Sequence, residues 1–166
     1  MDKLLHDSLR PATCPTVIPS EIINLVDTVD WTGFGTAYGE AEGTIPHYLK
    51  NLFCSDSNVS NEATHQLWCS LCHQHAFISS AALPAYPILI RALINLDEKL
   101  KIEILDIMSG FASCLHRGAL NKSLIEWEIK LYNLMLADRP LFKDLAEHPD
   151  KDISNFSQAI LSDLNA

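Results

Sequence analysis

Apolar residues in this chain recur every three or four positions over long stretches, which is the spacing of one buried face of an α-helix. The segment from Glu98 to Leu115 shows this pattern clearly, and the segment from Asn121 to Leu136 repeats it. No stretch of useful length alternates polar and apolar residues as a half-buried strand does. The sequence therefore predicts an all-α fold. Further helices are expected near residues 20–29, 45–53, 56–73, 78–96 and 150–164, and residues 31–38 suggest a short helix broken by Gly33, Gly35 and Gly39.

Prolines indicate several boundaries of these helices. Pro46 fits the first turn of a helix, where its missing N–H is not needed. Pro84 and Pro87 predict a kink or break within residues 78–96, because proline removes a backbone donor. An extended N-terminal arm over residues 1–19, followed by a single helical domain over residues 20–166, is predicted from the prolines at positions 11, 15 and 19.

Residues 30–90 also carry short motifs in a fixed order, namely Asp30-Trp31, Ala37-Tyr38-Gly39, Ile45-Pro46 and His73-Gln74. With these motifs the chain resembles a bacterial HEAT-like repeat family over the middle third to half of its length. The resemblance implies a short HEAT-like α-solenoid of about eight helices, with His73-Gln74 at an exposed corner between two of them. His75 departs from the pattern, because the family more usually has glycine there, and glycine adopts a left-handed conformation more readily than histidine.

An internal echo supports a repeated architecture. The pattern Asp-x-x-Val-Ser-Asn at residues 56–61 recurs as Asp-x-x-Ile-Ser-Asn at residues 150–155, and the two aspartates are 94 positions apart. This offset corresponds to two units of about 47 residues, near the upper end of HEAT-type periods. Each aspartate is predicted to cap a helix, and the Val or Ile that follows is predicted to be its first buried residue.

Charge limits the classes of partner. The 166 residues include 12 lysines and arginines against 21 aspartates and glutamates, which gives a net charge of −9. Direct nucleic-acid binding is disfavoured, because neutralising phosphates requires clustered basic residues. The acidic charge favours a basic protein partner, because opposite charges attract over long range. Such a charge is also ordinary for a soluble cytosolic domain.

The N-terminus and the cysteines suggest a compartment. The sequence contains no apolar run of transmembrane length, and its first residues lack the pattern of a secretory signal. We therefore expect a cytoplasmic protein without a membrane partner. The five scattered cysteines fit reduced thiols better than a disulfide framework.

Residues 69–73 read Cys-Ser-Leu-Cys-His and formally match the attachment signature of c-type haem. Haem attachment is disfavoured, because it belongs to exported proteins and the motif falls within a predicted helix. Zinc is disfavoured as well, because four ligands within seven residues of one helix cannot easily surround a tetrahedral ion. A redox pair needs a helix N-terminus to lower its thiol pKa, whereas this pair is expected near a helix C-terminus. The prediction is no cofactor, no metal and no catalytic residue.

Helical repeats build surfaces, so a binding function is expected. The leading hypothesis is a bacterial immunity protein that neutralises a cognate toxin, a basic protein domain, by occluding its active surface. A scaffold or adaptor is the alternative, although it requires two separable faces. An enzyme on a HEAT-like fold is the third and least favoured class.

Two regions supply candidate residues for partner binding. An aromatic residue flanked by carboxylates near position 127 could anchor a basic surface, with a place in the core as the alternative. The pair at positions 73–74 could lie on a binding face, with hydrogen bonds to the free carbonyls of a helix end as the alternative. The predicted partner-binding residues are Glu126, Trp127, Glu128, Asp144, Glu147, His73 and Gln74.

Overall fold

The computed structural model describes residues 17–165, and over this range the secondary structure is almost entirely helical. The predicted all-α class is therefore confirmed. The N-terminal arm predicted for residues 1–19 lies mostly outside the described residues. The α-helices are α1 (Ser20–Asp27), α2 (Ile45–Asn51), α3 (Ser57–Leu67), α4 (Ala82–Asn95), α5 (Glu98–Leu120), α6 (Glu126–Ala137), α7 (Arg139–Ala146) and α8 (Lys151–Leu164).

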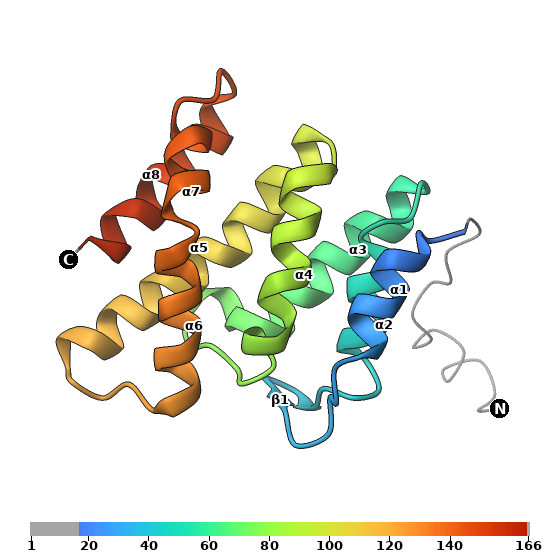
Figure 1. Ribbon diagram of the computed structural model, residues 1–166, viewed down its shortest axis with the longest axis horizontal. Helices are drawn as coiled ribbons and strands as arrows, with labels where there is room; N and C mark the ends of the chain where they lie inside the picture. Colours follow the sequence, from blue (N-terminus) through green and yellow to red (C-terminus); the bar gives the residue numbers. More distant parts are fainter. Residues whose placement is uncertain (1–16, 166) are drawn as a thin grey trace, which may run out of the picture.

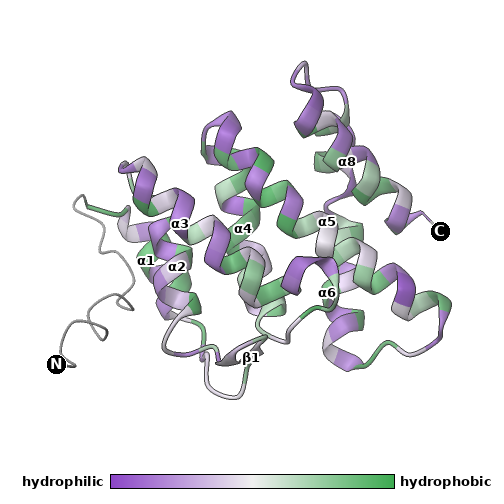
Figure 2. Cartoon of the chain, turned by 180° about the vertical axis from the view of Figure 1, so that it is seen from behind, coloured by the Kyte–Doolittle hydropathy of each residue, from purple (hydrophilic) through white to green (hydrophobic). Residues whose placement is uncertain are grey.

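The helices are arranged in two layers. Helices α1, α4, α6 and α7 lie in the front layer of Figure 1, and α3, α5 and α8 lie behind them. Figure 2 shows the molecule from behind, with the rear layer of α3, α5 and α8 towards the viewer, and the helix ends at the top of this view are mostly hydrophilic. Helix α2 packs against both α1 and α3, and the long helix α5 packs against α3, α4, α6 and α8. Helix α5 is thus the central element of the array.

Three helices of the rear layer begin with an aspartate that caps the helix N-terminus. Asp56 precedes α3, Asp97 precedes α5 and Asp150 precedes α8, and each carboxylate accepts a hydrogen bond from a backbone N–H of the first turn. These bonds satisfy donors that a helix N-terminus otherwise leaves free. The predicted capping role of Asp56 and Asp150 is confirmed, and the residues three positions later, Val59 and Ile153, are buried as expected.

The core is one continuous cluster that extends from Ile22 in α1 to Leu164 in α8. Its largest fully buried side chains include Tyr86 in α4, Phe111 in α5 and Phe142 in α7. Because residues from the first and last helices join the same cluster, burial of this apolar surface couples the whole array.

Two predicted elements are wrong. Residues 31–38 do not form a helix; they lead into an antiparallel hairpin made of β1 (Gly35–Thr36) and β2 (Gly39–Glu40). The glycines explain the difference, because Gly33 and Gly39 adopt positive φ angles of 80° and 132°, which a helix does not contain. Pro84 and Pro87 were predicted to cause a kink or a break, and no break is present, since α4 continues through Pro87 and Pro84 lies in its first turn.

Helix α7 is an element that the sequence analysis missed. Helix α6 ends at Ala137, and α7 follows after Asp138. Pro140 lies in the first turn of α7, where a missing N–H costs no hydrogen bond. Within the described residues, no helix is both long and apolar enough to cross a membrane.

Candidate binding surface at a left-handed turn

Three consecutive residues form a turn that is unusual for L-amino acids. His73, Gln74 and His75 have φ angles of 36°, 56° and 64°, all in the left-handed region. The chain reaches this turn from α3 through a π-helical segment, η2 (Trp68–Cys72), and the turn itself forms η3 (His73–His75). The left-handed conformation costs roughly 1–2 kcal/mol for each non-glycine residue. Surrounding contacts must therefore hold the turn in place.

Helix α5 supplies these contacts. The guanidinium of Arg117 donates a hydrogen bond of 2.9 Å to the carbonyl oxygen of His75. Gly110 lets the turn approach α5 closely, because a Cβ at this position would lie 2.7 Å from Cδ2 of His75 and 3.0 Å from Sγ of Cys72. A glycine within a long helix is therefore explained by packing against the turn.

The side chain of His75 is directed to a different neighbour. Its Nε2 lies 2.9 Å from Oδ1 of Asp106 in α5, and its ring is tilted against the indole of Trp68 at a centroid distance of 6.4 Å. His75 itself has a left-handed backbone, with φ 64°. Its side chain therefore joins the turn to η2 and α5.

The hairpin β1–β2 packs beside this turn. The amide of Ala37 donates to the carbonyl oxygen of Ser70 at 2.9 Å, and the amide of Gly35 donates to Oγ of Ser80 at 2.9 Å. These bonds place Tyr38, at the tip of the hairpin, edge-on to His73 with ring centroids 5.9 Å apart. Two motifs that are 35 positions apart in the sequence thus meet at one surface.

Phe77 completes an aromatic patch, which we define as Tyr38, His73 and Phe77. The rings of His73 and Phe77 are 5.1 Å apart. Tyr38 is 68% exposed and Phe77 is 48% exposed, although each ring contacts His73. Gln74 is exposed next to the patch. Nδ1 of His73 is buried and has no hydrogen-bond partner among the described residues.

The other predicted residues lie elsewhere and are not brought together. Glu126, Trp127 and Glu128 form the first turn of α6, whereas Asp144 and Glu147 lie at the far end of α7. In Figure 1, α7 follows α6 towards the top of the view, so the two acidic groups lie at opposite ends of this pair of helices.

Local contacts already occupy part of the α6 group. Glu126 forms an ion pair of 2.7 Å with Lys130, and this hydrogen bond lowers the pKa of the Glu126 carboxyl. Oε2 of Glu128 accepts a hydrogen bond of 2.9 Å from the amide of Ile125, which caps the helix. Trp127 is partly buried and packs against the core, a placement that favours its structural interpretation.

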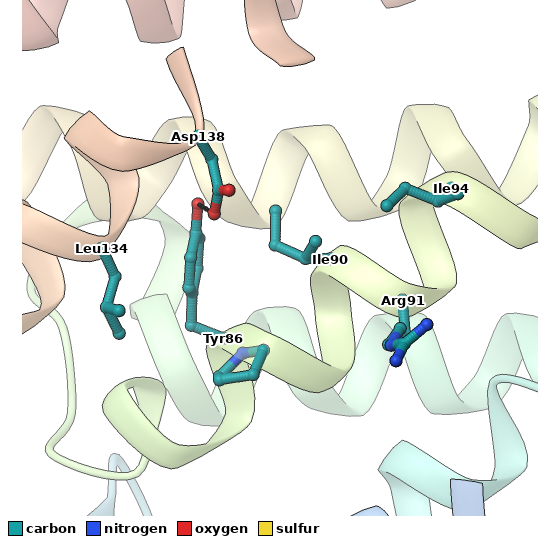
Figure 3. Close-up of a pocket in the computed structure, with 7 residues that line it drawn as sticks. Tyr86, Ile90, Arg91, Ile94, Leu134 and Asp138 are labelled. Carbon is teal, nitrogen blue, oxygen red and sulfur yellow. Dashed lines mark hydrogen bonds between the residues drawn. The ribbon is translucent and has the colours of Figure 1, made fainter. Parts of the chain in front are cut away.

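A second surface feature is a groove between α4 and α6, shown in Figure 3. Its volume is about 260 Å³, and Ile94 and Leu134 on its walls are 54% and 39% exposed. The hydroxyl of Tyr86 donates a 2.9 Å hydrogen bond to Oδ2 of Asp138, as the figure shows. The residues that line the groove are Tyr86, Pro87, Ile90, Arg91, Ile94, Leu134 and Asp138.

Cysteines near the turn are poorly suited to nucleophilic chemistry. Burial raises the pKa of the Cys72 thiol to about 12, and burial also raises the pKa of Cys114 despite the opposing effect of Arg117. Both thiols are therefore protonated at neutral pH. Among residues 17–165, no three His, Cys, Asp or Glu side chains are grouped so that they could hold a metal ion.

The expectation of reduced thiols is wrong at Cys54. Cys54, which follows α2, is disulfide-bonded, whereas Cys69, Cys72 and Cys114 are free thiols. Disulfides are typical of oxidising compartments, so this bond favours such a compartment over the cytoplasm.

Sequence analysis named His73 and Gln74 but missed Tyr38 and Phe77 as surface residues. Tyr38 belongs to the motif Ala37-Tyr38-Gly39, but its exposure follows from the hairpin, which the sequence analysis did not predict. Comparison of the chain with known protein families, with curated proteins and with solved structures finds no match.

Proposed function

We propose that this chain is a non-catalytic protein-binding module built as a short HEAT-like α-solenoid, and that the aromatic patch with Gln74 is the centre of its binding surface. The observation that carries this proposal is the exposure of Tyr38 and Phe77 on both sides of His73 at a left-handed turn. Aromatic side chains dominate the energetic centres of protein interfaces, because they bury large areas at a small cost in conformational entropy.

Backbone strain supports the same proposal. A turn that is left-handed at His73, Gln74 and His75 lowers stability, and such conformations cluster at binding and catalytic sites. Contacts from Arg117 and the space left by Gly110 fix the turn before any partner arrives. A pre-organised surface loses less conformational entropy on association, so it binds more tightly for the same contact area.

The sharpest form of the proposal is a bacterial immunity protein that binds and occludes a cognate toxin. Its partner is then a basic protein domain, because the net charge of −9 accelerates encounter with a cation and opposes association with nucleic acid. This form places the protein in the cytoplasm. The disulfide at Cys54 disfavours the cytoplasm, because that compartment keeps thiols reduced. Alkylation of free thiols in intact cells tests the location. A cytoplasmic protein would be labelled at Cys54.

The chemistry of the side chains around the turn supports a non-catalytic function. The two thiols that contact the turn have raised pKa values and are weak nucleophiles at neutral pH. Among the described residues, the imidazole of His75 contacts Asp106 and Trp68, and neither of them offers a hydroxyl or thiol nucleophile.

Capture of the tagged protein from its native lysate, followed by mass spectrometry, tests this function. The wild type should retain one stoichiometric basic partner, and the double variant Tyr38→Ala/Phe77→Ala should lose it. Leu120→Ala is a matched control, because Leu120 is 66% exposed but lies at the C-terminal end of α5, outside the patch. Equal retention by the double variant would contradict the proposal, as would recovery of the wild type alone.

A scaffold that joins two proteins is the second candidate, and the groove between α4 and α6 is the observation that favours it. The groove and the aromatic patch are built from different elements, so the chain offers two separable surfaces. Ile94→Asp would place a charge on the groove wall without touching the patch. A scaffold would lose one of two captured partners in this variant, whereas an immunity protein would keep its single partner.

A further inference from the structure

Cys54 takes part in a disulfide bond, and the sequence leaves one candidate for its partner within the chain. Cysteines occupy positions 14, 54, 69, 72 and 114. Those at positions 69, 72 and 114 are free thiols. Elimination therefore leaves Cys14, which precedes the described residues.

Hydrogen bonds support the thiol form of two of the other cysteines. The thiol of Cys72 donates a hydrogen bond of 3.3 Å to the carbonyl oxygen of Trp68, and the thiol of Cys114 donates one of 3.5 Å to the carbonyl oxygen of His75. A sulfur atom in a disulfide has no proton to donate. Both contacts therefore fit reduced cysteines, and neither of these sulfur atoms competes with Cys14 for Cys54.

The connectivity of the chain keeps Cys14 within reach of Cys54. Val17 follows Cys14 by three positions, and each residue spans at most about 3.6 Å, so their Cα atoms lie within roughly 11 Å of each other. Val17 directly precedes the start of the fold at α1, and α1 packs against α2, which Cys54 follows. In Figure 1 the start of α1 and the loop between α2 and α3 lie at the same end of the array. The short separation that a disulfide requires, about 4–7 Å between Cα atoms, is therefore accessible to this pair.

We propose that Cys14 and Cys54 form this disulfide, and that the bond braces the N-terminal part of the fold. The two cysteines are 40 positions apart, and the loop that their bond closes contains α1, the β1–β2 hairpin and α2. Tyr38 at the tip of the hairpin thus belongs to a segment that is fixed covalently at both ends. A cross-link of this kind stabilises the fold mainly because it restricts the unfolded chain, and the effect grows with the length of the loop. The pairing does not depend on the identity of any partner protein.

Formation of the bond is a two-electron oxidation, and a small disulfide such as oxidised glutathione is a sufficient oxidant. The thiolate of one cysteine attacks a sulfur atom of the oxidant, which forms a mixed disulfide and releases one glutathione. The thiolate of the second cysteine then attacks the protein sulfur of the mixed disulfide, which forms the bond between Cys14 and Cys54 and releases a second glutathione. The protons of the two protein thiols end on the two glutathione thiols, so one disulfide replaces another. The exchange favours the bond in an oxidising compartment and the two thiols in a reducing one.

Mass spectrometry of the full chain, equilibrated in an oxidising glutathione buffer, tests the pairing. Alkylation with N-ethylmaleimide in denaturant should modify three cysteines before reduction and all five after it, because three thiols are free. Cleavage after Lys50 and before Asp56 releases residues 51–55, in which Cys54 is the only cysteine. This peptide should be recovered bonded to the peptide that carries Cys14. The variant Cys14→Ser should accept four alkyl groups without reduction, because it frees Cys54.

Thermal unfolding with and without reductant tests the bracing role. Reduction should lower the Tm of the wild type by about 10 °C, given the length of the closed loop and the size of the chain. Cys14→Ser should show the lower Tm from the start and no further response to reductant. Cys69→Ser, which removes a free thiol, is the matched control and should respond to reductant as the wild type does.

Three results would overturn the proposal. Five alkylated cysteines before reduction would mean that the bond does not form in solution. Recovery of residues 51–55 bonded to a different peptide, or a covalent dimer in the intact mass, would assign another partner to Cys54. A Tm that reduction leaves unchanged would show that the bond does not brace the fold.

Discussion

The ring of Tyr38 lies edge-on to the imidazole of His73, with centroids 5.9 Å apart and an angle of 69° between the two planes. This contact joins the tip of the β1–β2 hairpin to a turn whose backbone is strained. The left-handed turn lowers the stability of the free protein. The contact places the exposed ring of Tyr38 beside this turn, where binding of a partner can offset that cost.

Gly110 should be intolerant of a side chain. Gly110→Ala adds a Cβ that would lie 2.7 Å from the ring of His75 and 3.0 Å from the buried side chain of Cys72. The substitution gains helix propensity, but overpacking should dominate and lower the free energy of unfolding by about 1–3 kcal/mol. Urea denaturation measures this change. Gly43→Ala is the control, because a Cβ there meets nothing within 4 Å, and a comparable loss in both variants would refute the packing argument.

Two substitutions of His75 isolate the backbone strain. His75→Ala removes the contacts with Asp106 and Trp68 but keeps the left-handed backbone unfavourable, whereas His75→Gly removes the same contacts and relieves the strain. The glycine variant should be more stable than the alanine variant by about 1 kcal/mol. Chemical denaturation of both variants gives the difference directly. Equal stabilities would mean that the turn is not strained at this position.

The cap of α8 should contribute measurably to stability. Oδ1 of Asp150 accepts hydrogen bonds of 2.9 Å from the amide of Asp152 and 3.1 Å from that of Ile153. Asp150→Ala should therefore lower the free energy of unfolding by about 1 kcal/mol, and Asp150→Asn should cost much less because asparagine also caps helices. Thermal and urea unfolding of the pair decide the matter. A loss of the same size in Asp150→Asn would point to charge instead of capping.

Tyr86 should couple stability to alkaline pH. Burial, together with the nearby carboxylate of Asp138, raises the pKa of the Tyr86 hydroxyl above its ordinary value of 10.0. Above pH 10 the unfolded chain loses this proton while the folded chain keeps it, so the stabilisation is fully present below pH 10 and is lost as the pH rises. The slope should be about 1.4 kcal/mol per pH unit for this one group.

Tyr86→Phe tests that coupling against the wild type. Removal of the 2.9 Å hydrogen bond to Asp138 should lower stability at pH 7 by about 1–2 kcal/mol. Above pH 10 the variant should lose stability less steeply than the wild type, because phenylalanine does not ionise. Urea denaturation between pH 7 and about 11 measures both effects. Parallel curves for the two proteins would contradict the raised pKa. The raised pKa of Cys72 affects both proteins equally.

Much of the helical framework could be predicted from the sequence, because periodicity and caps are local signals. The aspartates at positions 56 and 150 and the proline at position 46 were assigned to helix starts, and the structure has them there. Residues 31–38 were misassigned as a short helix broken by glycines, whereas the chain turns at Gly33 and Gly39, which have positive φ angles, and forms a hairpin. The sequence marks these glycines as breaks but does not show which strands pair across them.

The candidate surface was only half predictable, because it depends on contacts between distant segments. His73-Gln74 could be recognised from its motif, but its left-handed conformation depends on Arg117 and on the space beside Gly110, which lie in a later helix. Tyr38 and His73 meet only after the hairpin docks on Ser70 and Ser80. No local pattern in the sequence encodes these tertiary contacts.

Photocrosslinking in the native cell tests the central claim most directly. A benzophenone amino acid placed at position 38 should crosslink to one basic protein, identified by mass spectrometry of the adduct, because Tyr38 is 68% exposed at the proposed interface. The same probe at position 120, which is 66% exposed but outside the patch, should give no such adduct. A single basic partner crosslinked from position 38 alone is the predicted result. The absence of any specific adduct from position 38, or the same adducts from both positions, would contradict the account.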